Sequence, residues 1–227
     1  FDKSGLKQFT FSTIDILNPS PATCRISSFA FRKCEKLTRV IGNNIKSINN
    51  DAFAGCCLMG SIDLKYVIQI GPGAFSSCIS IKHAFLTSCS IIGRNAFRGC
   101  HELEFVDLCS AGCQISNNAF QRCYDLDRIN LQHVTYIGSL AFDGCLSIEF
   151  VELAHNVTCG HRIFRNAGVR RMILSTGIFT HDTFTDMSDL VGALFICDTD
   201  QCEQVYSRIV PQLPGTVFTP RTGRPST

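Results

Sequence analysis

The hydrophobic positions of this chain recur with a period of about 22 residues. An Ala-Phe pair followed by a cysteine three residues later occurs six times, at Phe31, Phe53, Phe75, Phe97, Phe120 and Phe142, with weaker copies at Phe164 and Phe184. The steps between these Phe residues are 22, 22, 22, 23, 22, 22 and 20. A nearly fixed period of this length is the signature of a repeat architecture.

A second pattern, apolar-x-x-apolar-x-apolar, lies between these marks, as in Leu103-x-x-Val106-x-Leu108. Its last two apolar residues are separated by one position, so both point to the same side of a short strand. A third apolar mark, such as Ile92, stands five residues before each Phe. Each repeat therefore predicts one coil, with a strand, a return segment and a tight Ala-Phe turn that share one core.

One such coil cannot enclose its own apolar face, whereas stacked coils share a continuous core. The sequence predicts a mainly β repeat solenoid with the Phe side chains in a buried column. An all-β sandwich is the alternative, because its strands also recur at short intervals. A sandwich gives no reason for an Ala-Phe-x-x-Cys motif at a constant step, so the solenoid is favoured.

The strings Ile92 to Leu103 and Ile137 to Ile148 resemble the BspA-type, or Treponema-type, leucine-rich repeat, and the resemblance covers about residues 6–195. It implies a curved, right-handed stack of coils with a parallel sheet on the concave face. Family members are commonly surface or secreted proteins of bacteria and protozoa that bind partner proteins in adhesion. The chain departs from the family in lacking a Pro after the strand and in its high cysteine content.

The ends of the array predict separate units. We expect an N-terminal cap with an irregular first coil at 1–24, the solenoid at 25–196, a short capping helix at 197–210 and an extended tail at 211–227. The helix is predicted because Asp200-x-x-Glu203 fits a capping box and an apolar stripe follows it with helical spacing. The tail is rich in Pro, Gly and Thr.

Composition excludes several classes of protein. The chain has 227 residues, 45% hydrophobic and 18% charged, which is typical of a folded globular protein. The net charge of +2 gives no basic excess for nucleic acid, and no apolar run reaches the length of a membrane span. The chain begins at Phe1 without a signal-peptide pattern, so the question of a preceding targeting segment stays open.

Most of the 14 cysteines follow the repeat. Six occupy the same place after the Phe and predict a buried column of small apolar side chains, and Cys159 falls at an apolar return mark. The remaining seven are Cys24, Cys57, Cys89, Cys109, Cys113, Cys197 and Cys202. Cys89 and Cys113 lie near matching places on adjacent coils and could form a disulfide. No spacing matches a zinc site, so we expect no metal.

A candidate partner-binding surface follows from the alternation of side chains along each strand. Core-directed positions do not explain Phe85, Phe105 and Phe150, which point to the other side. Aromatic residues mixed with arginine are typical of protein interfaces. The predicted partner-binding residues are Arg39, His83, Phe85, Phe105, Asp107, Arg128, Asn130, Phe150, Glu152 and Arg171. Alternatively, these rings only cover one another or form a homodimer contact.

The sequence carries no nucleophile elbow, phosphate loop, dinucleotide fingerprint or HExxH motif, so we expect neither an enzyme nor a cofactor. Asn156-Val157-Thr158 is a glycosylation sequon, which matters only in a glycosylating compartment. The sequence thus predicts a non-catalytic protein-binding module, secreted or at the cell surface, that is a monomer or weak homodimer. An intracellular, cytoplasmic scaffold or regulatory subunit is the alternative.

Overall fold

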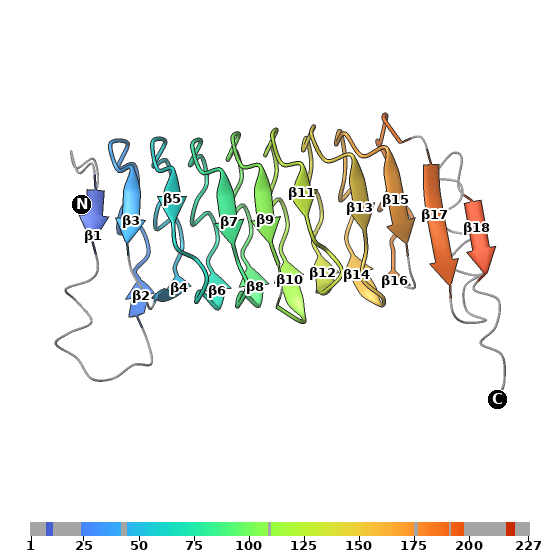
Figure 1. Ribbon diagram of the computed structural model, residues 1–227, viewed down its shortest axis with the longest axis horizontal. Helices are drawn as coiled ribbons and strands as arrows, with labels where there is room; N and C mark the ends of the chain where they lie inside the picture. Colours follow the sequence, from blue (N-terminus) through green and yellow to red (C-terminus); the bar gives the residue numbers. More distant parts are fainter. Residues whose placement is uncertain are drawn as a thin grey trace.

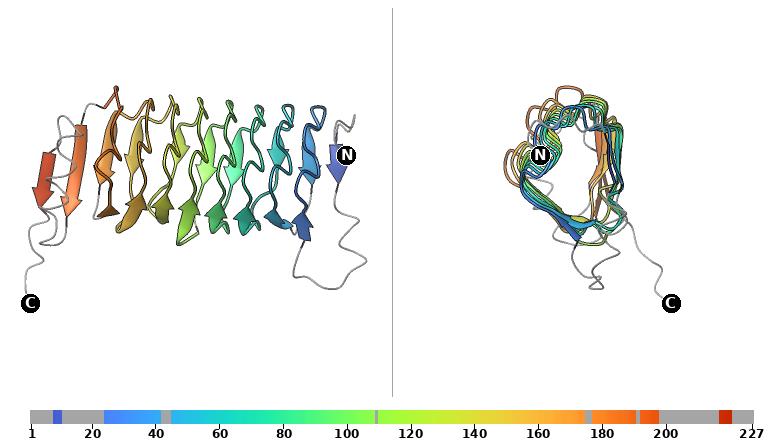
Figure 2. Two further views of the ribbon diagram at one scale, coloured as in Figure 1. Left: turned by 180° about the vertical axis from the view of Figure 1, so that it is seen from behind. Right: turned by 90° about the vertical axis from the view of Figure 1, so that its left-hand side faces the viewer.

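The computed structural model describes residues 8–10, 24–41, 45–108, 110–174, 177–190, 192–197 and 217–220. These residues form a solenoid of stacked coils with two rows of short parallel strands (Figure 1). Seen along its axis, the coils lie almost one behind another around a common interior (Figure 2). The predicted mainly β solenoid is therefore confirmed.

The upper row in Figure 1, which we name the first sheet, consists of three pieces that follow one another along the array. Its strands are β1 (Gln8–Thr10), β3 (Arg39–Ile41) and β5 (Ser61–Ile62); then β7 (His83–Phe85), β9 (Phe105–Asp107) and β11 (Arg128–Ile129); then β13 (Phe150–Glu152), β15 (Arg171–Leu174), β17 (Gly192–Cys197) and β18 (Val217–Pro220).

The lower row, which we name the second sheet, is continuous and has eight strands. They are β2 (Cys24–Ile26), β4 (Ile45–Ile48), β6 (Gln69–Ile70), β8 (Ile91–Ile92), β10 (Cys113–Ile115), β12 (Val134–Ile137), β14 (Val157–Cys159) and β16 (Gly177–Ile178). The repeat predicted one sheet and a return segment. The return segment is itself a strand, because its apolar mark pairs with the same mark on the next coil, as Ile70 does with Ile92.

The coils follow one another along a nearly straight line in Figure 1, so the curved stack with a concave sheet face implied by the family resemblance is not seen in that view. No helix occurs in the described part of the chain. Of the capping helix expected at 197–210, only Cys197 is described, where it ends β17, and the rest lies outside the described residues. Val217–Pro220, expected in the extended tail, forms β18 and pairs in parallel with β17.

The core contains a stack of phenylalanine rings. Successive ring centroids from Phe31 to Phe164 lie 5.1 to 5.5 Å apart, with interplanar angles of at most 17°. The rings from Phe53 to Phe164 have no exposed surface. This arrangement follows from the nearly constant repeat length, because a fixed number of residues per coil places each Phe next to the Phe of the preceding coil.

The Ala-Phe turns are also bonded from coil to coil. The amide of Phe53 donates to the carbonyl oxygen of Ala74 (2.8 Å), and the amide of Phe75 donates to that of Ala96 (2.8 Å). In each of the turns from Phe31 to Phe164, two positions have positive φ, for example Asn95 (58°) and Gly99 (73°). Asn, Asp and Gly accept this conformation most readily, which explains why they recur in the turns.

At both breaks in the first sheet, a side chain just after the strand accepts a hydrogen bond from a nearby backbone amide. After β5, Asp63 accepts a hydrogen bond from the amide of Lys65 (3.0 Å), and after β11, Asn130 accepts one from the amide of Gln132 (3.0 Å). Such local turns compete with strand pairing. The sheet breaks after both strands, between β5 and β7 and between β11 and β13.

Candidate functional site

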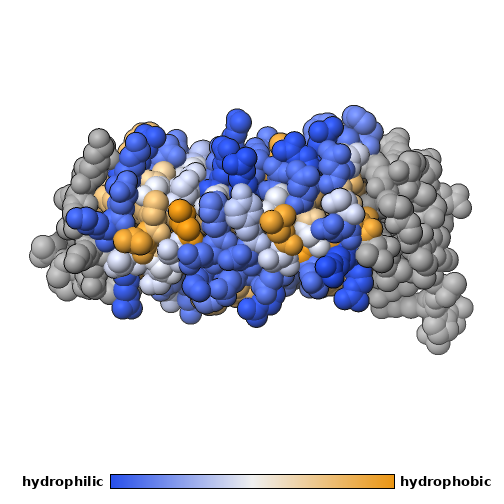
Figure 3. Space-filling view, turned by 90° about the horizontal axis from the view of Figure 1, so that it is seen from above, coloured by the Kyte–Doolittle hydropathy of each residue, from blue (hydrophilic) through white to orange (hydrophobic). Residues whose placement is uncertain are grey.

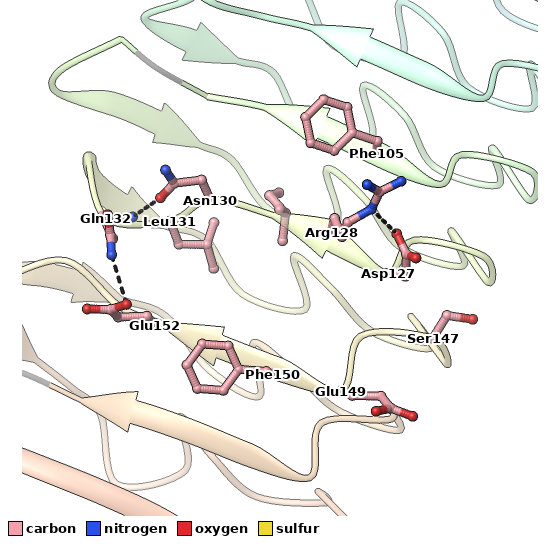
Figure 4. Close-up of a pocket in the computed structure, with 11 residues that line it drawn as sticks. Phe105, Asp127, Arg128, Asn130, Leu131, Gln132, Ser147, Glu149, Phe150 and Glu152 are labelled. Atoms are coloured by element: carbon pink, nitrogen blue, oxygen red, sulfur yellow. Dashed lines mark hydrogen bonds and ion pairs between the residues drawn. The ribbon is translucent and has the colours of Figure 1, made fainter.

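A hollow of about 670 Å³ opens on the outward face of the first sheet, at the break between β11 and β13 (Figure 4). Phe105 and Phe150 come from the strands on either side of β11 and form two of its walls. Beyond β11, a single bridge between Leu131 and Leu153 connects the two sheet pieces. The hollow therefore lies at one of the two breaks in the first sheet.

The floor of the hollow is apolar. Ile129 and Leu131 line it, and Leu131 is 1% exposed. Ile129 is half-buried, whereas the residues at its repeat position in the adjacent coils, Val106 and Val151, are fully or almost fully buried. The opening thus uncovers part of a core side chain.

One wall is an aromatic cluster that extends from β7 to β11. The rings of Phe85 and Phe105 meet edge to face with centroids 5.8 Å apart, and the ring of His83 lies 6.3 Å from that of Phe85. The guanidinium of Arg128 lies over the Phe105 ring, 5.4 Å from its centroid. Phe85 remains 50% exposed, so the cluster presents apolar surface to solvent.

The rim of the hollow carries more carboxylates than cations. Asp127, Glu149 and Glu152 line it, whereas Arg128 is the one cationic side chain among the lining residues. Arg128 Nε lies 3.2 Å from a carboxylate oxygen of Asp127, and Glu152 accepts a hydrogen bond from Gln132 (2.8 Å). The carboxylate of Glu149 is 67% exposed and has a distant ion pair of 4.0 Å with Arg170. The rim is therefore net acidic.

The structure brings half of the predicted partner-binding residues together. Those that line the hollow are Phe105, Arg128, Asn130, Phe150 and Glu152. Phe85 and His83 extend the surface through their ring contacts, Asp107 pairs in register with Phe85, and Arg171 pairs with Phe150. Arg39, on β3, pairs with Ser61 on β5, in the separate first piece of the sheet, and so lies apart from the hollow.

Sequence reasoning missed the acidic residues Asp127 and Glu149, which lie just before the outward strand positions. Their repeat place holds Glu104 in the preceding coil, so three consecutive coils carry a carboxylate there. This column of carboxylates could have been recognised in the sequence.

The edge at which the first-sheet strands begin is mostly hydrophilic, with apolar residues in separate patches (Figure 3).

Three of the cysteines that sequence analysis left unassigned belong to a second core column. Cys24, Cys89 and Cys113 stand two or three residues before the buried Ile of the second sheet, at the place that Val67 and Val134 take in other coils. Cys89 and Cys113 are both buried free thiols, so the suggested disulfide is not formed in the structure. Burial raises the pKa of Cys89 to about 12 and that of Cys113 to about 11.

A cluster of polar side chains joins the turns of three coils. Asp143 is almost fully buried and accepts hydrogen bonds from Gln121 (2.7 Å) and from two nitrogens of Arg165 (both 2.9 Å). Burial raises the pKa of Asp143, but the hydrogen bonds from Arg165 and Gln121 outweigh this and hold the pKa below its usual value. Both carboxylate oxygens of the buried Asp143 accept hydrogen bonds within the cluster, which fits a structural role.

The family model described as BspA type leucine-rich repeat region matches this chain in six copies, over residues 3–126 and 70–191. The chain belongs to the BspA-type leucine-rich repeat family. No curated protein matches this BspA-type chain. In the described part of the chain there is no helix long and apolar enough to cross a membrane, and no group of three metal-ligating side chains.

Solved structures are similar to this BspA-type chain. A leucine-rich cell surface protein of Faecalibacterium prausnitzii is 22% identical, with a TM-score of 0.53, and the match covers 76% of this chain and 52% of that protein. The T. pallidum leucine-rich repeat protein is 28% identical (TM-score 0.54; 63% and 69% covered). The pneumococcal vaccine antigen PcpA is 15% identical (TM-score 0.51; 96% and 69% covered). The chain thus spans about half the length of the F. prausnitzii protein.

Proposed function

We propose that this chain is a non-catalytic protein-binding module whose partner protein docks on the outward face of the first sheet, between β7 and β13. The observation that carries the proposal is the row of outward rings, in which Phe85 is 50% and Phe150 46% exposed beside the hollow. Interfaces are enriched in aromatic residues and arginine, and their energetic centres are apolar pockets with a polar rim. The hollow with its acidic rim has this composition.

The same face suits recognition because strand pairing holds its backbone, on both sides of β9 and on one side of β13. Phe105 pairs in parallel with His83 and with Arg128, and Phe150 pairs with Arg171. Side chains on such strands are pre-organised, so this chain loses little conformational entropy when a partner binds. Arg39 and Arg171 then contact the outer parts of a larger partner, since each is exposed on the same face.

The cysteines support a structural role rather than a catalytic one. A nucleophilic thiol needs a lowered pKa and access to substrate. Burial instead raises the pKa of Cys89 and of Cys100 to about 12. The hydrogen bond with the Cys78 thiol lowers the pKa of Cys56, but Cys56 is completely buried and has no access to substrate. We therefore propose no enzymatic activity and no cofactor for this chain.

We place the chain in a secreted or cell-surface protein that takes part in adhesion or recognition. The support is its similarity to a protein described as a cell surface protein and to another described as a vaccine antigen. In such a setting Asn156, which is exposed in a turn before β14, is the predicted glycan acceptor. We expect the chain itself to be a monomer or a weak homodimer.

An intracellular scaffold is the second candidate, and one observation favours it. Among the cysteines described in the core, Cys56, Cys78, Cys89, Cys100, Cys113, Cys123, Cys145 and Cys159 are free thiols. Thiol titration of the denatured, unreduced protein separates the two settings. Close to 14 free thiols, the full cysteine count, would favour a reducing compartment, whereas several blocked thiols would favour a secreted protein.

The proposed face is tested with Phe105→Ser/Phe150→Ser in the full chain. Immobilised wild type and variant are exposed to the same protein extract, and the retained proteins are identified. We expect the partner retained by the wild type to be lost from the variant. The control is Ile68→Ser/Ile91→Ser, which removes two apolar residues that are 48% and 38% exposed and lie outside the first sheet.

The thermal unfolding midpoint is measured for each variant, because Phe105 is half-buried. Phe150→Ser alone, at a 46% exposed position, keeps the test valid where the double variant is destabilised. Loss of the partner from the control, or its retention by both Phe variants in their folded form, would contradict the proposed face.

A further inference from the structure

We propose that the hollow over β11 takes the side chain of an arginine from the partner protein. This inference rests on the proposed function, since it names the group that the first-sheet face recognises. It follows from three properties of the hollow: a partly uncovered apolar floor, a phenylalanine ring that carries no cation, and an excess of carboxylates on the rim.

The floor and walls suit the aliphatic part of a long side chain. Ile129 is partly exposed at the base, and the rings of Phe105 and Phe150 stand on either side of β11 (Figure 4). Arginine and lysine bury their methylene groups against apolar surface while the charged end stays near water. The hollow, at about 670 Å³, is within the range of sites that hold small ligands.

The aromatic wall already shows how a guanidinium binds here. Arg128 of this chain lies over one face of the Phe105 ring at 5.4 Å, and its Nε pairs with Asp127. Phe150 offers an equivalent ring that is 46% exposed, and among the described residues no cation lies over it. A planar guanidinium stacks on such a ring better than a compact ammonium does.

The charge of the rim selects the sign of the ligand. Three carboxylates line the hollow against one guanidinium. Near Phe150, Glu149 has only a long, exposed ion pair of 4.0 Å with Arg170, and Glu152 accepts a hydrogen bond from the neutral Gln132. A carboxylate accepts a guanidinium through two parallel hydrogen bonds. An anionic side chain would instead face uncompensated repulsion.

The test uses the full chain labelled with nitrogen-15 and N-acetyl-arginine amide as the probe. The amide signals of Ile129, Phe150 and Glu152 are followed during titration, with the amides of N-acetyl-lysine and N-acetyl-leucine and with N-acetyl-glutamate as comparisons. We expect saturable shifts confined to the hollow with the arginine probe, weaker shifts with lysine, and none with glutamate.

Variants make the test specific. Glu149→Gln/Glu152→Gln removes two rim charges, and we expect roughly threefold to tenfold weaker binding of the arginine probe, since exposed ion pairs contribute modestly. Phe150→Leu keeps the apolar wall without the ring and should also weaken binding. Glu102→Gln removes a carboxylate outside the hollow and should leave the affinity unchanged. Added salt should weaken binding of the probe to the wild type.

Three outcomes would overturn the inference: equal binding of the leucine or glutamate probe, shifts spread over other faces, or an affinity that is the same in the Glu149→Gln/Glu152→Gln variant. The failure of this inference differs from the failure of the proposed function. If partner capture is lost in the Phe variants but the arginine probe does not bind, the partner still docks on this face but not through an arginine in the hollow. If the probe binds while capture persists, the partner docks elsewhere.

Discussion

The thiol of Cys100 donates a hydrogen bond to the carbonyl oxygen of Phe75 in the preceding coil, with 3.1 Å between sulfur and oxygen. The same bond recurs from Cys56, Cys78, Cys123 and Cys145, at 3.0 to 3.1 Å. A small residue would fill this column equally well, but among small apolar residues only cysteine adds a donor. The relationship gives a physical reason for the unusual cysteine content.

Buried thiols predict slow modification of the native protein. With Cys100 completely buried and its pKa raised by burial to about 12, we expect iodoacetamide at pH 8 to leave it unlabelled in the folded state and to label it fully in guanidinium without reductant. Cys57 is partly exposed and serves as the internal control, labelled in both states. Peptide mass spectrometry reads each site. A disulfide-linked peptide pair containing Cys89 and Cys113 would contradict the free thiols described above.

The phenylalanine stack predicts a large loss of stability at its centre. Phe97 has neighbouring rings at 5.1 and 5.3 Å and no exposed surface. We expect Phe97→Ala to lower the free energy of unfolding by about 3–5 kcal/mol, because it opens a cavity and removes two stacking contacts. Urea denaturation measures the effect. Leu146→Ala, at a 59% exposed position, should change it little, and equal effects at both positions would contradict the stack.

Close stacking of the coils predicts that a side chain at Gly93 lowers the stability of the fold. A Cβ atom there would lie 2.6 Å from both the carbonyl carbon of Gly71 and the nitrogen of Pro72, and these are backbone atoms that cannot move aside. We expect Gly93→Ala to destabilise the fold by about 1–3 kcal/mol, as overpacked cores do. At Gly60 the nearest atom would be 3.9 Å away, so Gly60→Ala is the matched control. Thermal unfolding of the two variants decides, and equal midpoints would refute the close approach.

The lowered pKa of Asp143 predicts a pH dependence of stability. Because the folded-state pKa lies below the ordinary value of 3.8, the ionised carboxylate stabilises the fold above that value and loses this contribution as the pH falls through the folded-state pKa. We expect Asp143→Asn to cost about 1–3 kcal/mol at pH 7, where it removes charge-assisted hydrogen bonds. The difference from the wild type should shrink below about pH 4.

Urea denaturation at pH 7 and at pH 3 measures this difference. Asp127→Asn is the control, since the side chain of Asp127 is 50% exposed and its ion pair with Arg128 is a surface pair. A difference between the wild type and Asp143→Asn that stays constant between the two pH values would show that the charge of Asp143 is not what stabilises the cluster.

The regular part of the fold was predictable from the sequence, because each coil repeats the same apolar positions. The second sheet was not predicted, since its strands carry only one or two core residues, as in Gln69–Ile70. The core column of Cys89 and Cys113 was harder to find, because other coils place Ile45, Val67 or Val134 there and the column has no constant residue type.

The outward rings were also predictable, from their places between core positions. The hollow beside them was not. It lies at the break after β11, where Asn130 accepts a hydrogen bond from the Gln132 amide and the guanidinium of Arg128 lies over the Phe105 ring. Neither the break in the sheet nor the direction of an arginine side chain follows from periodicity. The acidic residues Asp127 and Glu149 could have been found by reading the column that precedes the outward positions.

The most direct test of the account is photo-crosslinking of the full chain to its partner. Phe150→p-benzoylphenylalanine places the reactive group at the hollow, and Tyr136→p-benzoylphenylalanine places it on β12 of the second sheet, where Tyr136 is 37% exposed. We predict a crosslinked partner from position 150 and none from position 136, with the crosslink beside an arginine of the partner. A partner crosslinked from position 136 but not from position 150 would contradict binding through the first sheet.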